Sequence, residues 1–410
     1  MSTVVDTVIV GAGQAGLATS YFLQQRGHSH VVLEKAPRVA SAWRTGRWDS
    51  FTLITPNWTF LLPGAEYSGD EREGFMPLAE VVERFDRYVE SNHLPVQCGV
   101  EVTAVESNRA GEGFIVRTTA GEWQAAHVVI AAGLYQSPKR LPFAAALDSS
   151  ITQIHSGEYK NAAQLPAGAV LVLGSGQSGC QIAEELNEEG RQVYLSLGLV
   201  GRAPRRYRGK DTFTWLMECG FMDRTPDMLP SPRAKYAANP QVSGQKGGHT
   251  LNLHKFARDG IVLLGRVQSG SGTTIQFLPN RNESLARGDA IEKNIVGVID
   301  GYIQRSGHSA PEESLPELRD GYTGEEITEL DLEALGITSI IWATGYNFDF
   351  SWVRFPVFDG DGFPMQKQGV TEVPGLYFVG LPWMTKYKSG LLAGVGEDAA
   401  HVAAHIAGGG

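Results

Sequence analysis

Val8-Ile9-Val10-Gly11-Ala12-Gly13-Gln14-Ala15-Gly16-Leu17-Ala18 is the stretch of sequence that decides the fold. Apolar residues run into a G-x-G-x-x-G motif and out again into a helical pattern, which is the strand, turn and helix that bind a dinucleotide. Gly11 is expected to make the tight turn, and Gly13 to let a pyrophosphate approach the backbone. Gly16 is expected to let the helix lie close to the strand, with free N–H groups directed at the anion.

An acidic residue follows this motif at the position that a dinucleotide site requires. The apolar stretch Val31-Val32-Leu33 ends at Glu34, about twenty residues after the first glycine, where a carboxylate binds the ribose hydroxyls. A glycine motif alone is also found in ordinary turns. Because the flanking strand, the helix and the acid are all present, the sequence favours the nucleotide site.

The chain length, the net charge and the lengths of the apolar runs exclude several classes of protein. A chain of 410 residues is too long for one core and fits two domains. Its net charge of -10 argues against nucleic acid as a partner, because phosphate binding needs a basic surface. No apolar run is long enough to span a membrane, and Met1-Ser2-Thr3 shows no leader pattern, so we expect a cytoplasmic protein without a membrane partner.

The cysteines and histidines give no sign of a disulfide or metal site. Cys98, Cys180 and Cys219 are far apart, so they form neither a redox pair nor a disulfide framework. His249 and His254 lack a companion carboxylate or cysteine at a useful spacing, so no metal site is expected.

The opening pattern is repeated in the middle of the chain. Ala169-Val170-Leu171-Val172-Leu173 leads into Gly174-Ser175-Gly176-Gln177-Ser178-Gly179 and a helix. The position that corresponds to Glu34 is Leu197, which is preceded by Ser196 and followed by Arg202, Arg205, Arg206 and Arg208. A hydroxyl and guanidiniums suit a 2'-phosphate, so NADPH is favoured over NADH. The alternative is that these arginines lie on a solvated loop.

The remaining sequence predicts further α/β elements. Helices are expected over 77–91, 283–304 and 394–406, and strands over 100–105, 113–118, 127–131, 192–197, 339–342 and 376–379. Ala131-Ala132-Gly133 and Ala343-Thr344-Gly345 are similar small-residue turns at strand ends, where the chain would pass between domains. A helix is conceivable over 211–220 and a strand over 261–264, but 209–279 gives no clear pattern. The predicted fold class is α/β with two Rossmann-like dinucleotide-binding domains.

With both glycine motifs, the missing second acid and the Ala-Thr-Gly turn, the chain resembles the class B flavin monooxygenases. This family includes flavin-containing monooxygenases, Baeyer-Villiger and N-hydroxylating enzymes, and the YUCCA enzymes. Ala40-Ser41-Ala42-Trp43 and Trp48-Asp49-Ser50-Phe51 look most like the YUCCA-type and bacterial branch. His155-Ser156 and Tyr159 match the family's linker signature, whereas Ser149 and Ile151 stand where it has Phe and Gly.

The resemblance implies a split FAD domain, 1–145 and 340–410, with an NADPH domain over 155–335 inserted into it. It also implies an FAD-dependent NADPH monooxygenase, in which NADPH reduces the flavin and O2 then forms a C4a-(hydro)peroxyflavin. The small organic substrate would be oxygenated at nitrogen, sulfur or a carbonyl carbon. For the YUCCA branch an arylpyruvate is conceivable as substrate.

The expected cofactor-binding residues lie in the two motifs and in the turns that face them. Those of the first motif and the segment after it are Gly11, Gly13, Gln14, Ala15, Gly16, Glu34, Lys35, Trp43 and Arg44. Those of the second motif are Gly174, Gly176, Gln177, Ser178, Gly179, Ser196 and Arg202. The turns and the C-terminal unit add Ala132, Gly133, Thr344, Gly345, Gly380 and Glu397.

Three residues are candidates for a catalytic role. Asn57 would donate to the flavin peroxide or the nucleotide, with simple turn chemistry beside Pro56 as the alternative. Arg44, or Arg47 in its place, would stabilise a peroxide anion. His155 would transfer a proton or, as the alternative, steady the linker.

Two other functions stay open at this stage. One is an FAD-dependent NAD(P)H oxidoreductase without oxygen insertion, such as a disulfide or ferredoxin reductase, although the paired cysteines of the former are missing. The other is a flavin redox sensor without turnover. A homodimer is also an open expectation.

Overall fold

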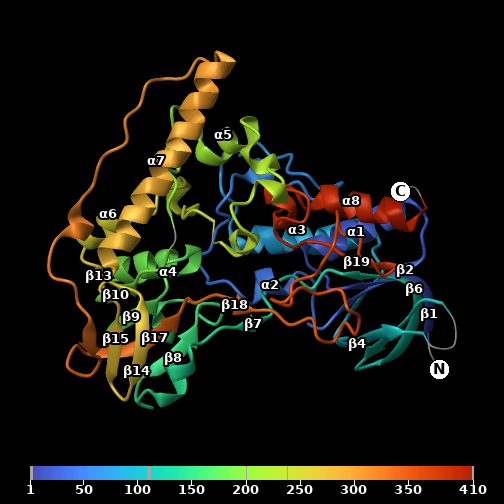
Figure 1. Cartoon of the computed structure of the whole chain (residues 1–410), viewed down its shortest axis with the longest axis horizontal. Coiled ribbons are helices and arrows are strands. Elements are labelled where there is room, and N and C mark those ends of the chain that lie inside the picture. The colour runs from blue at the N-terminus through green and yellow to red at the C-terminus, as the bar shows by residue number, and fades with distance from the viewer. Residues whose placement is uncertain (1–2, 109–111, 200, 238, 409–410) are drawn as a thin grey trace.

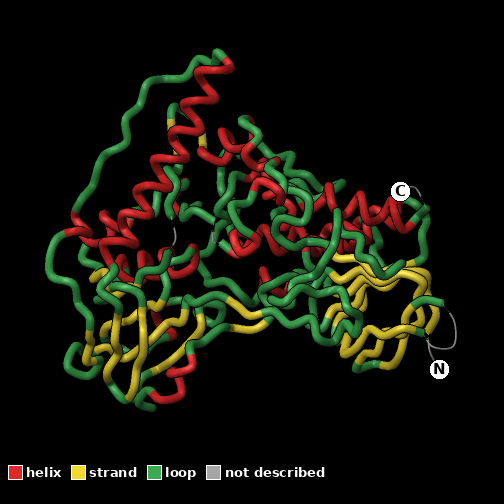
Figure 2. Tube along the Cα trace, in the orientation of Figure 1, coloured by secondary structure: helices red, strands yellow, loops and turns green. Residues whose placement is uncertain are grey.

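The computed structural model of the chain describes residues 3–108, 112–199, 201–237 and 239–408. Met1 and Ser2, on which the expected absence of a leader partly rests, lie outside these ranges. The strands gather into two main sheets, one at each end of the molecule (Figures 1 and 2).

The first sheet contains the first glycine motif. Its order is β3 (Val96–Cys98), β2 (His30–Glu34), β1 (Thr3–Val10), β6 (Gly121–Ile130), β5 (Phe114–Thr118) and β4 (Val102–Ser107), and β19 (Leu376–Phe378) also pairs with β6. Strands β3, β2, β1, β6 and β19 are parallel, whereas β6, β5 and β4 are antiparallel. Every residue of β2 is buried, as in a parallel strand covered on both faces.

The second sheet contains the repeated motif and is entirely parallel. Its order is β13 (Val262–Leu264), β10 (Val193–Ser196), β9 (Ala169–Leu173), β17 (Ile337–Trp342) and β8 (Thr152–His155). In both sheets the strand before the glycine motif has one neighbour on each side, so the motif opens at the carboxyl edge where an α/β sheet binds its ligand. The two parallel units confirm the predicted fold class.

Helices cover both sheets. The first motif leads into α1 (Gln14–Gln25), beside α8 (Val395–Ile406) and near α3 (Leu78–Ser91) (Figure 1). The second leads into α4 (Gln177–Glu188), and α6 (Leu253–Arg258) lies near it. Helix α7 (Arg281–Ser306) projects from the second unit, and a long loop returns beside it (Figure 2).

Two linkers join the units. Strand β7 (Ser137–Pro138) on the outward linker pairs with β18 (Tyr346–Asn347) on the return linker, in an antiparallel ribbon. Strands β8 and β17 belong to the second sheet, so 152–155 and 337–342 pair with the second glycine unit. The limits 155–335 expected for an inserted domain stay a prediction.

The segment that the sequence left unassigned, 209–279, holds several short elements. Helix α5 (Thr212–Glu218) lies within the range expected for it. Short 3-10 turns follow at Phe221–Asp223, Pro226–Met228, Pro232–Tyr236 and Gln245–Gly247. The sequence did not predict the hairpin formed by β14 (Val267–Ser271) and β15 (Thr274–Phe277). Strand β15 also pairs with β16 (Glu329–Asp331).

None of the helices among the described residues combines the length and the apolar character needed to cross a membrane.

Candidate functional site

The first glycine turn has an open face in front of helix α1. A Cβ added to Gly13 would meet no atom within 4 Å, whereas one on Gly16 would overlap the carbonyl oxygen of Gly11. Gly11 itself has a φ of 107°, which an L residue rarely adopts. Helix α1 begins after Gly13 without a side-chain cap and without an acidic residue in its first turn, so its N–H groups are free to bind an anion. The turn fits a dinucleotide pyrophosphate.

Glu34 lies at the end of β2, beside this turn. Its carboxylate is buried and accepts hydrogen bonds from the backbone N–H of Ala12 at 2.8 Å and of Ala36 at 2.9 Å. Because a carboxylate has about four acceptor positions, two such bonds leave room for a ribose hydroxyl pair. The adjacent Lys35 is exposed.

A chain of hydrogen bonds links the first turn to the segments expected to contact the flavin. The indole N–H of Trp43 donates to Gln14 Oε1 at 3.3 Å, and Gln14 Nε2 donates to the carbonyl of Gly390 at 2.8 Å. Ala15 lies against Gly380, where an added Cβ would overlap the Ala15 methyl. The C-terminal loop therefore packs directly on the first glycine motif.

The structure separates the two arginine candidates. Arg44 is committed to Asp86, with which it forms a close ion pair, and to the carbonyl of Val39 at 2.7 Å. Arg47 makes no ion pair with any described residue; its guanidinium lies 5.3 Å from the ring centres of both Trp43 and Phe51. Burial lowers the pKa of Arg47, while the nearby Tyr346 and Tyr135 oppose the shift. Arg47, unlike Arg44, is thus a cation without a carboxylate partner among the described residues.

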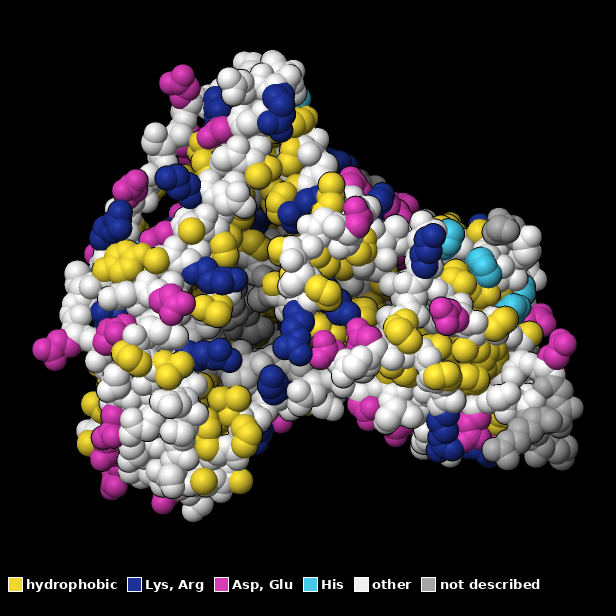
Figure 3. Space-filling view, viewed as in Figure 1, with side chains coloured by type: hydrophobic (Ala, Val, Ile, Leu, Met, Phe, Trp, Pro, Cys, Tyr) yellow, Lys and Arg dark blue, Asp and Glu magenta, His cyan; other side chains and the backbone are white. Residues whose placement is uncertain are grey.

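Arg47 stands at the junction of the two units. Lys160 of the second unit donates to the carbonyls of Thr45 at 2.7 Å and of Arg47 at 2.6 Å. Tyr346 and Tyr135, on the two linkers, lie with ring centres 5.4 Å apart. In Figure 3, Lys and Arg side chains surround the hollow between the two lobes, which favours anions there in spite of the negative net charge.

His155 is fully buried beside the return linker, and both of its ring nitrogens are engaged. The N–H of Gly157 donates to Nδ1 at 3.1 Å, so Nε2 carries the proton and donates to the carbonyl of Gly345 at 2.8 Å. Burial lowers the pKa of His155 and keeps it neutral. This geometry favours the alternative in which His155 steadies the linker.

The small-residue turns lie against the two glycine motifs in the same way. A Cβ on Gly11 would meet Ala131 and Ala132, and one on Gly174 would meet the carbonyl of Ala343. Gly133 and Gly345 end the two turns with φ values of 66° and 82°. Thr344 donates a close hydrogen bond to the carbonyl of Lys139 on the opposite linker.

Asn57 is buried and holds a loop. Its amide donates to the carbonyl of Glu71 at 2.9 Å, and its carbonyl accepts from the N–H of Met76 at 2.6 Å. These contacts agree with the turn chemistry that the sequence left as the alternative, and a catalytic role for Asn57 stays a prediction.

The second glycine turn repeats the geometry of the first. Gly174 has a φ of 109°, a Cβ on Gly176 would meet nothing within 4 Å, and one on Gly179 would overlap the carbonyl oxygen of Gly174. Helix α4 starts without a side-chain cap, and Ser178 is half-buried in its first turn. This turn also fits a dinucleotide. Gln177, however, is bonded to the main chain of Val242, so it holds protein rather than pointing freely outward.

Most groups expected to bind a 2'-phosphate are already bonded. Ser196 is buried and donates to the carbonyl of Gly265 at 2.9 Å. Arg202 forms ion pairs with Asp289 at 2.7 Å and Glu292 at 2.6 Å. Of the other arginines, Arg205 pairs with Asp211 and Arg208 with Asp300, whereas Arg206 makes no ion pair with a described residue.

Helix α8 begins in a cluster of charges that the sequence did not predict. Glu397 accepts from Lys386 and Lys388, each at 2.7 Å, and Lys388 also contacts Asp223 at 2.9 Å. Burial opposes ionisation of Glu397, but the bonds from the two lysines outweigh it and lower the pKa of this carboxyl. In the sequence, the spacing of Lys386 and Lys388 was the one signal of this charge cluster. It was not enough to predict the cluster, because the carboxylate partners are distant in sequence. Glu397 therefore fastens the C-terminal loop.

Comparisons with known proteins agree with this architecture. A family model described as Pyridine nucleotide-disulphide oxidoreductase matches residues 8–203. The chain is 32% identical over 405 residues to a Geobacillus kaustophilus protein named as an uncharacterized CzcO-like oxidoreductase, with 98% of each chain covered. It is 29% identical over 208 residues to the indole-3-pyruvate monooxygenase YUCCA1 of Oryza sativa, which covers 50% of this chain and 51% of that protein.

Solved structures share the fold over nearly the whole chain. The flavin-containing monooxygenase from Stenotrophomonas maltophilia superposes with a TM-score of 0.66 at 19% identity, covering 99% of both chains. The OTEMO complex with FAD and NADP superposes with a TM-score of 0.59 at 16% identity, covering 99% of this chain and 86% of that one.

Two open glycine turns, each at the end of a parallel strand, define an oxidoreductase fold with two dinucleotide-binding turns. Within this class the chain belongs to the CzcO-like oxidoreductases.

Proposed function

We propose that the chain is an NADPH- and O2-dependent flavoprotein monooxygenase that oxygenates a small organic substrate at nitrogen, sulfur or a carbonyl carbon. The observation that carries the proposal is Arg47 at the junction of the two units: its guanidinium lies against Trp43 and Phe51, donates to the Gly46 carbonyl at 2.8 Å and forms no ion pair with a described residue. Reduction of O2 at this junction develops negative charge on oxygen, which such a cation stabilises.

The cysteines support oxygenation over disulfide reduction. A disulfide reductase of the dithiol type needs two cysteines next to each other at the junction. Cys98 lies in β3, Cys180 in α4 and Cys219 at the end of α5, and all three are free. Burial raises the pKa of the Cys180 thiol well above its ordinary value, so it is a poor nucleophile.

In this proposal FAD binds at Gly11–Gly16 and NADPH at Gly174–Gly179, with the first unit and the C-terminal segment as the FAD domain. FAD held there would supply the redox chemistry between NADPH and O2. Gln14 orients Trp43 beside the first turn, and the N-terminus of α8 presents its positive dipole end to the same region. Arg47 then places its charge where the two cofactors meet.

Arg206 is the residue we assign to NADPH selection. Arg202, Arg205 and Arg208 are each neutralised by a carboxylate, whereas the exposed Arg206 has only a long contact of 3.5 Å to the carbonyl of Gly247. Leu197 in place of the ribose acid leaves no repulsion for a 2'-phosphate. The protein is expected to be reduced at lower concentrations of NADPH than of NADH, with that preference diminished in Arg206→Gln.

The test is a stopped-flow experiment on flavin-loaded protein, reduced with NADPH without oxygen and then mixed with oxygenated buffer. The proposal expects the flavin absorbance to return in two steps, with oxygenated product from a panel of amines, sulfides, ketones and arylpyruvates. Arg47→Met is expected to keep flavin content and NADPH reduction but to release hydrogen peroxide in place of product. Arg44→Met is the matched control, because that guanidinium is already paired with Asp86.

The other outcomes identify the alternatives. Rapid NADPH reduction followed by single-step reoxidation to hydrogen peroxide with every substrate would assign the protein to the NAD(P)H oxidoreductases without oxygen insertion. Bound flavin that NADPH does not reduce would assign it to the redox sensors.

A further inference from the structure

A closed loop of the second unit, residues 241–250, lies across the start of helix α4; we call it the strap. Ser243 and His249 pair in an antiparallel bridge, with N–H to carbonyl distances of 2.9 and 3.1 Å in the two directions. The turn Gln245–Gly247 forms its tip. The strap is therefore a closed hairpin in which the position of His249 fixes that of Ser243.

One end of the strap is bonded to the second glycine turn. The amide of Gln241 donates a close hydrogen bond to the carbonyl of Ser175. Gln177 exchanges two bonds with the main chain of Val242: it donates to the Val242 carbonyl and accepts from the Val242 N–H at 3.1 Å. Ser175 and Gln177 flank Gly176, whose open face receives the nucleotide. The strap thus borders the nucleotide site.

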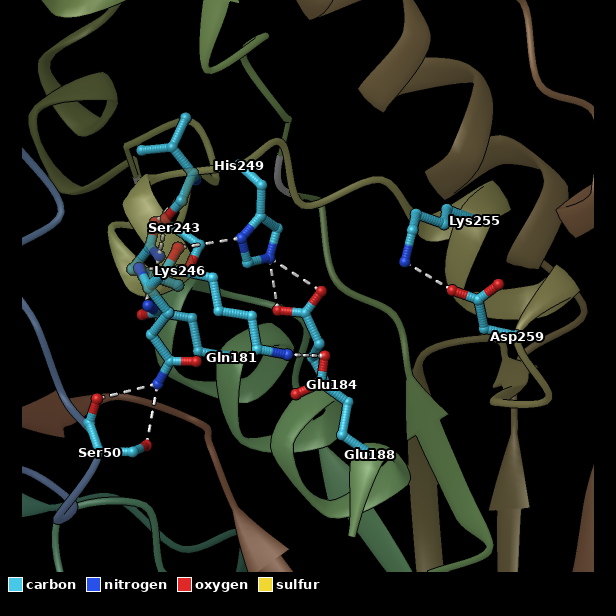
Figure 4. Close-up of polar contacts among 12 residues, drawn as sticks. Ser50, Gln181, Glu184, Glu188, Ser243, Lys246, His249, Lys255 and Asp259 are labelled. Atoms are coloured by element: carbon cyan, nitrogen blue, oxygen red, sulfur yellow. Dashed lines mark hydrogen bonds and ion pairs between the residues drawn. The ribbon is translucent and has the colours of Figure 1, made fainter. Parts of the chain in front are cut away.

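The other end is fastened to the side of α4. Gln177, Gln181, Glu184 and Glu188 follow one another at helical spacing and form one stripe of the helix. His249 Nε2 donates to the Glu184 carboxylate at 2.7 Å, and Lys246 bonds Glu188 at 2.5 Å (Figure 4). Glu184 is buried, with 7% of its surface exposed, whereas the Lys246 and Glu188 side chains are 64% and 45% exposed. The His249–Glu184 pair is therefore the stronger fastening.

The tip of the strap reaches the FAD unit. The Gln245 amide donates to the Ser50 carbonyl at 3.0 Å and to its hydroxyl at 2.9 Å (Figure 4). The Ser50 hydroxyl in turn donates to Glu185 on α4. The strap, helix α4 and the loop that carries Arg47 thus form one connected set of contacts.

We propose that Glu184 and His249 are positioning residues for the nicotinamide nucleotide, which hold the strap against the second glycine turn and so preform its binding site. A preformed loop needs no ordering when the nucleotide binds, so fastening increases affinity. This inference rests on the proposed nucleotide site at Gly174–Gly179, but it does not depend on the reaction with O2.

The proposal predicts a dependence on pH. The groups that face His249 are Glu184 on α4, Lys255 on α6 and Lys246 on the strap itself; Lys246 is bonded to Glu188 and Lys255 to Asp259 at 2.6 Å (Figure 4). The hydrogen bond to Glu184 raises the pKa of His249 against the effect of burial. The stabilisation is therefore complete below the ordinary histidine pKa of about 6.5. It is lost as the pH rises through the raised pKa, so NADP+ is expected to bind more weakly there.

The experiment measures NADP+ binding to flavin-loaded protein by isothermal titration between pH 6 and 9, for the wild type, Glu184→Gln and Glu188→Gln. Glu184→Gln is expected to weaken binding about three- to tenfold at pH 6, the scale of one charge-assisted hydrogen bond, and to bind like the wild type at pH 9. Any pH dependence that arises from titration of the nucleotide itself is the same for all three proteins, so it cancels when they are compared. Glu188→Gln is the matched control, because it breaks the exposed pair on the same strap and helix and should follow the wild type throughout.

A second measurement covers the case in which Glu184→Gln does not fold. Amide exchange of residues 241–250 in the wild type should slow on addition of NADP+ at pH 6, and His249→Gln should lose most of that protection. Parallel pH profiles for the wild type and Glu184→Gln, or strap exchange unaffected by NADP+, would overturn the proposal. Absence of any NADP+ binding by the wild type would instead contradict the nucleotide assignment itself.

Discussion

Alanine at the glycines of one motif should separate folding from cofactor binding. Gly13 has a φ of -83°, which any residue adopts, and its added methyl would meet no protein atom. Gly13→Ala should therefore change the stability of the flavin-free protein by no more than about 1 kcal/mol, the scale of a changed helix cap. In Gly16→Ala the methyl would overlap the Gly11 carbonyl oxygen and lie 3.1 Å from its carbon, which should cost about 1–3 kcal/mol of unfolding free energy.

For FAD affinity the expected order of the two variants is reversed, with Gly13→Ala affected more than Gly16→Ala. The Gly13→Ala methyl fills the space that the pyrophosphate needs, so at least one hydrogen bond to a charged group is lost. That loss costs about 1.5–3 kcal/mol, or roughly a ten- to 150-fold fall in affinity. The assay is flavin content by absorbance, FAD titration of stripped protein, and urea unfolding without cofactor. A Gly13→Ala protein that binds FAD like the wild type would refute the reasoning.

The second motif supplies the matched control. Gly176 is as open as Gly13, and Gly179 as closely packed as Gly16. Gly176→Ala should therefore keep full flavin content and lose NADP+ affinity, whereas Gly13→Ala should lose flavin first. Equal flavin loss in both variants would show that the alanines act through general destabilisation.

Two ion pairs that contain a buried cation give further predictions. Asp211→Asn leaves Arg205, which is 3% exposed, without its partner at 2.5 Å, and should lower the free energy of unfolding in urea by about 3–5 kcal/mol. The control is Glu218→Gln, which breaks an exposed pair with Lys210 and should cost less than about 1 kcal/mol. Equal effects of the two substitutions would contradict the prediction. Lys388→Met removes a cation that lowers the pKa of Glu397. Because that stabilisation is complete above the ordinary carboxyl pKa of 4.5 and is lost as the pH falls through the lowered pKa, the variant should lose less stability than the wild type in urea unfolding below pH 4.5.

The sequence predicted the two nucleotide turns because their requirements are local. A positive φ at Gly11 and Gly174, and a close contact at Gly16 and Gly179, are satisfied by glycine almost alone, so the motif carries its own geometry. The long helices and buried strands were also predicted, because their apolar pattern extends over many residues. The short α6 and the hairpin β14–β15 were missed, since elements of four to six residues give little periodicity.

The polar site could not be predicted in the same way, because its partners are distant in sequence. The position of Arg202 after β10 indicated a phosphate ligand, but Glu292, ninety residues later on α7, provides its counterion. Arg47 and Arg44 look alike in sequence, and only the approach of Asp86 on α3 distinguishes them. The His249–Glu184 pair likewise forms only when the strap folds back over α4.

The two motifs also share a type of side-chain contact that neither motif predicts. A glutamine occupies the same slot in each, and each binds the main chain of a distant segment: Gln14 donates to the carbonyl of Gly390, and Gln177 pairs with Val242. Each glycine turn is therefore joined by its glutamine to a segment far away in the sequence. On the proposed assignment, the C-terminal loop would border the FAD site and the strap would border the NADPH site. Because such contacts form only in the folded chain, the motif itself does not predict them.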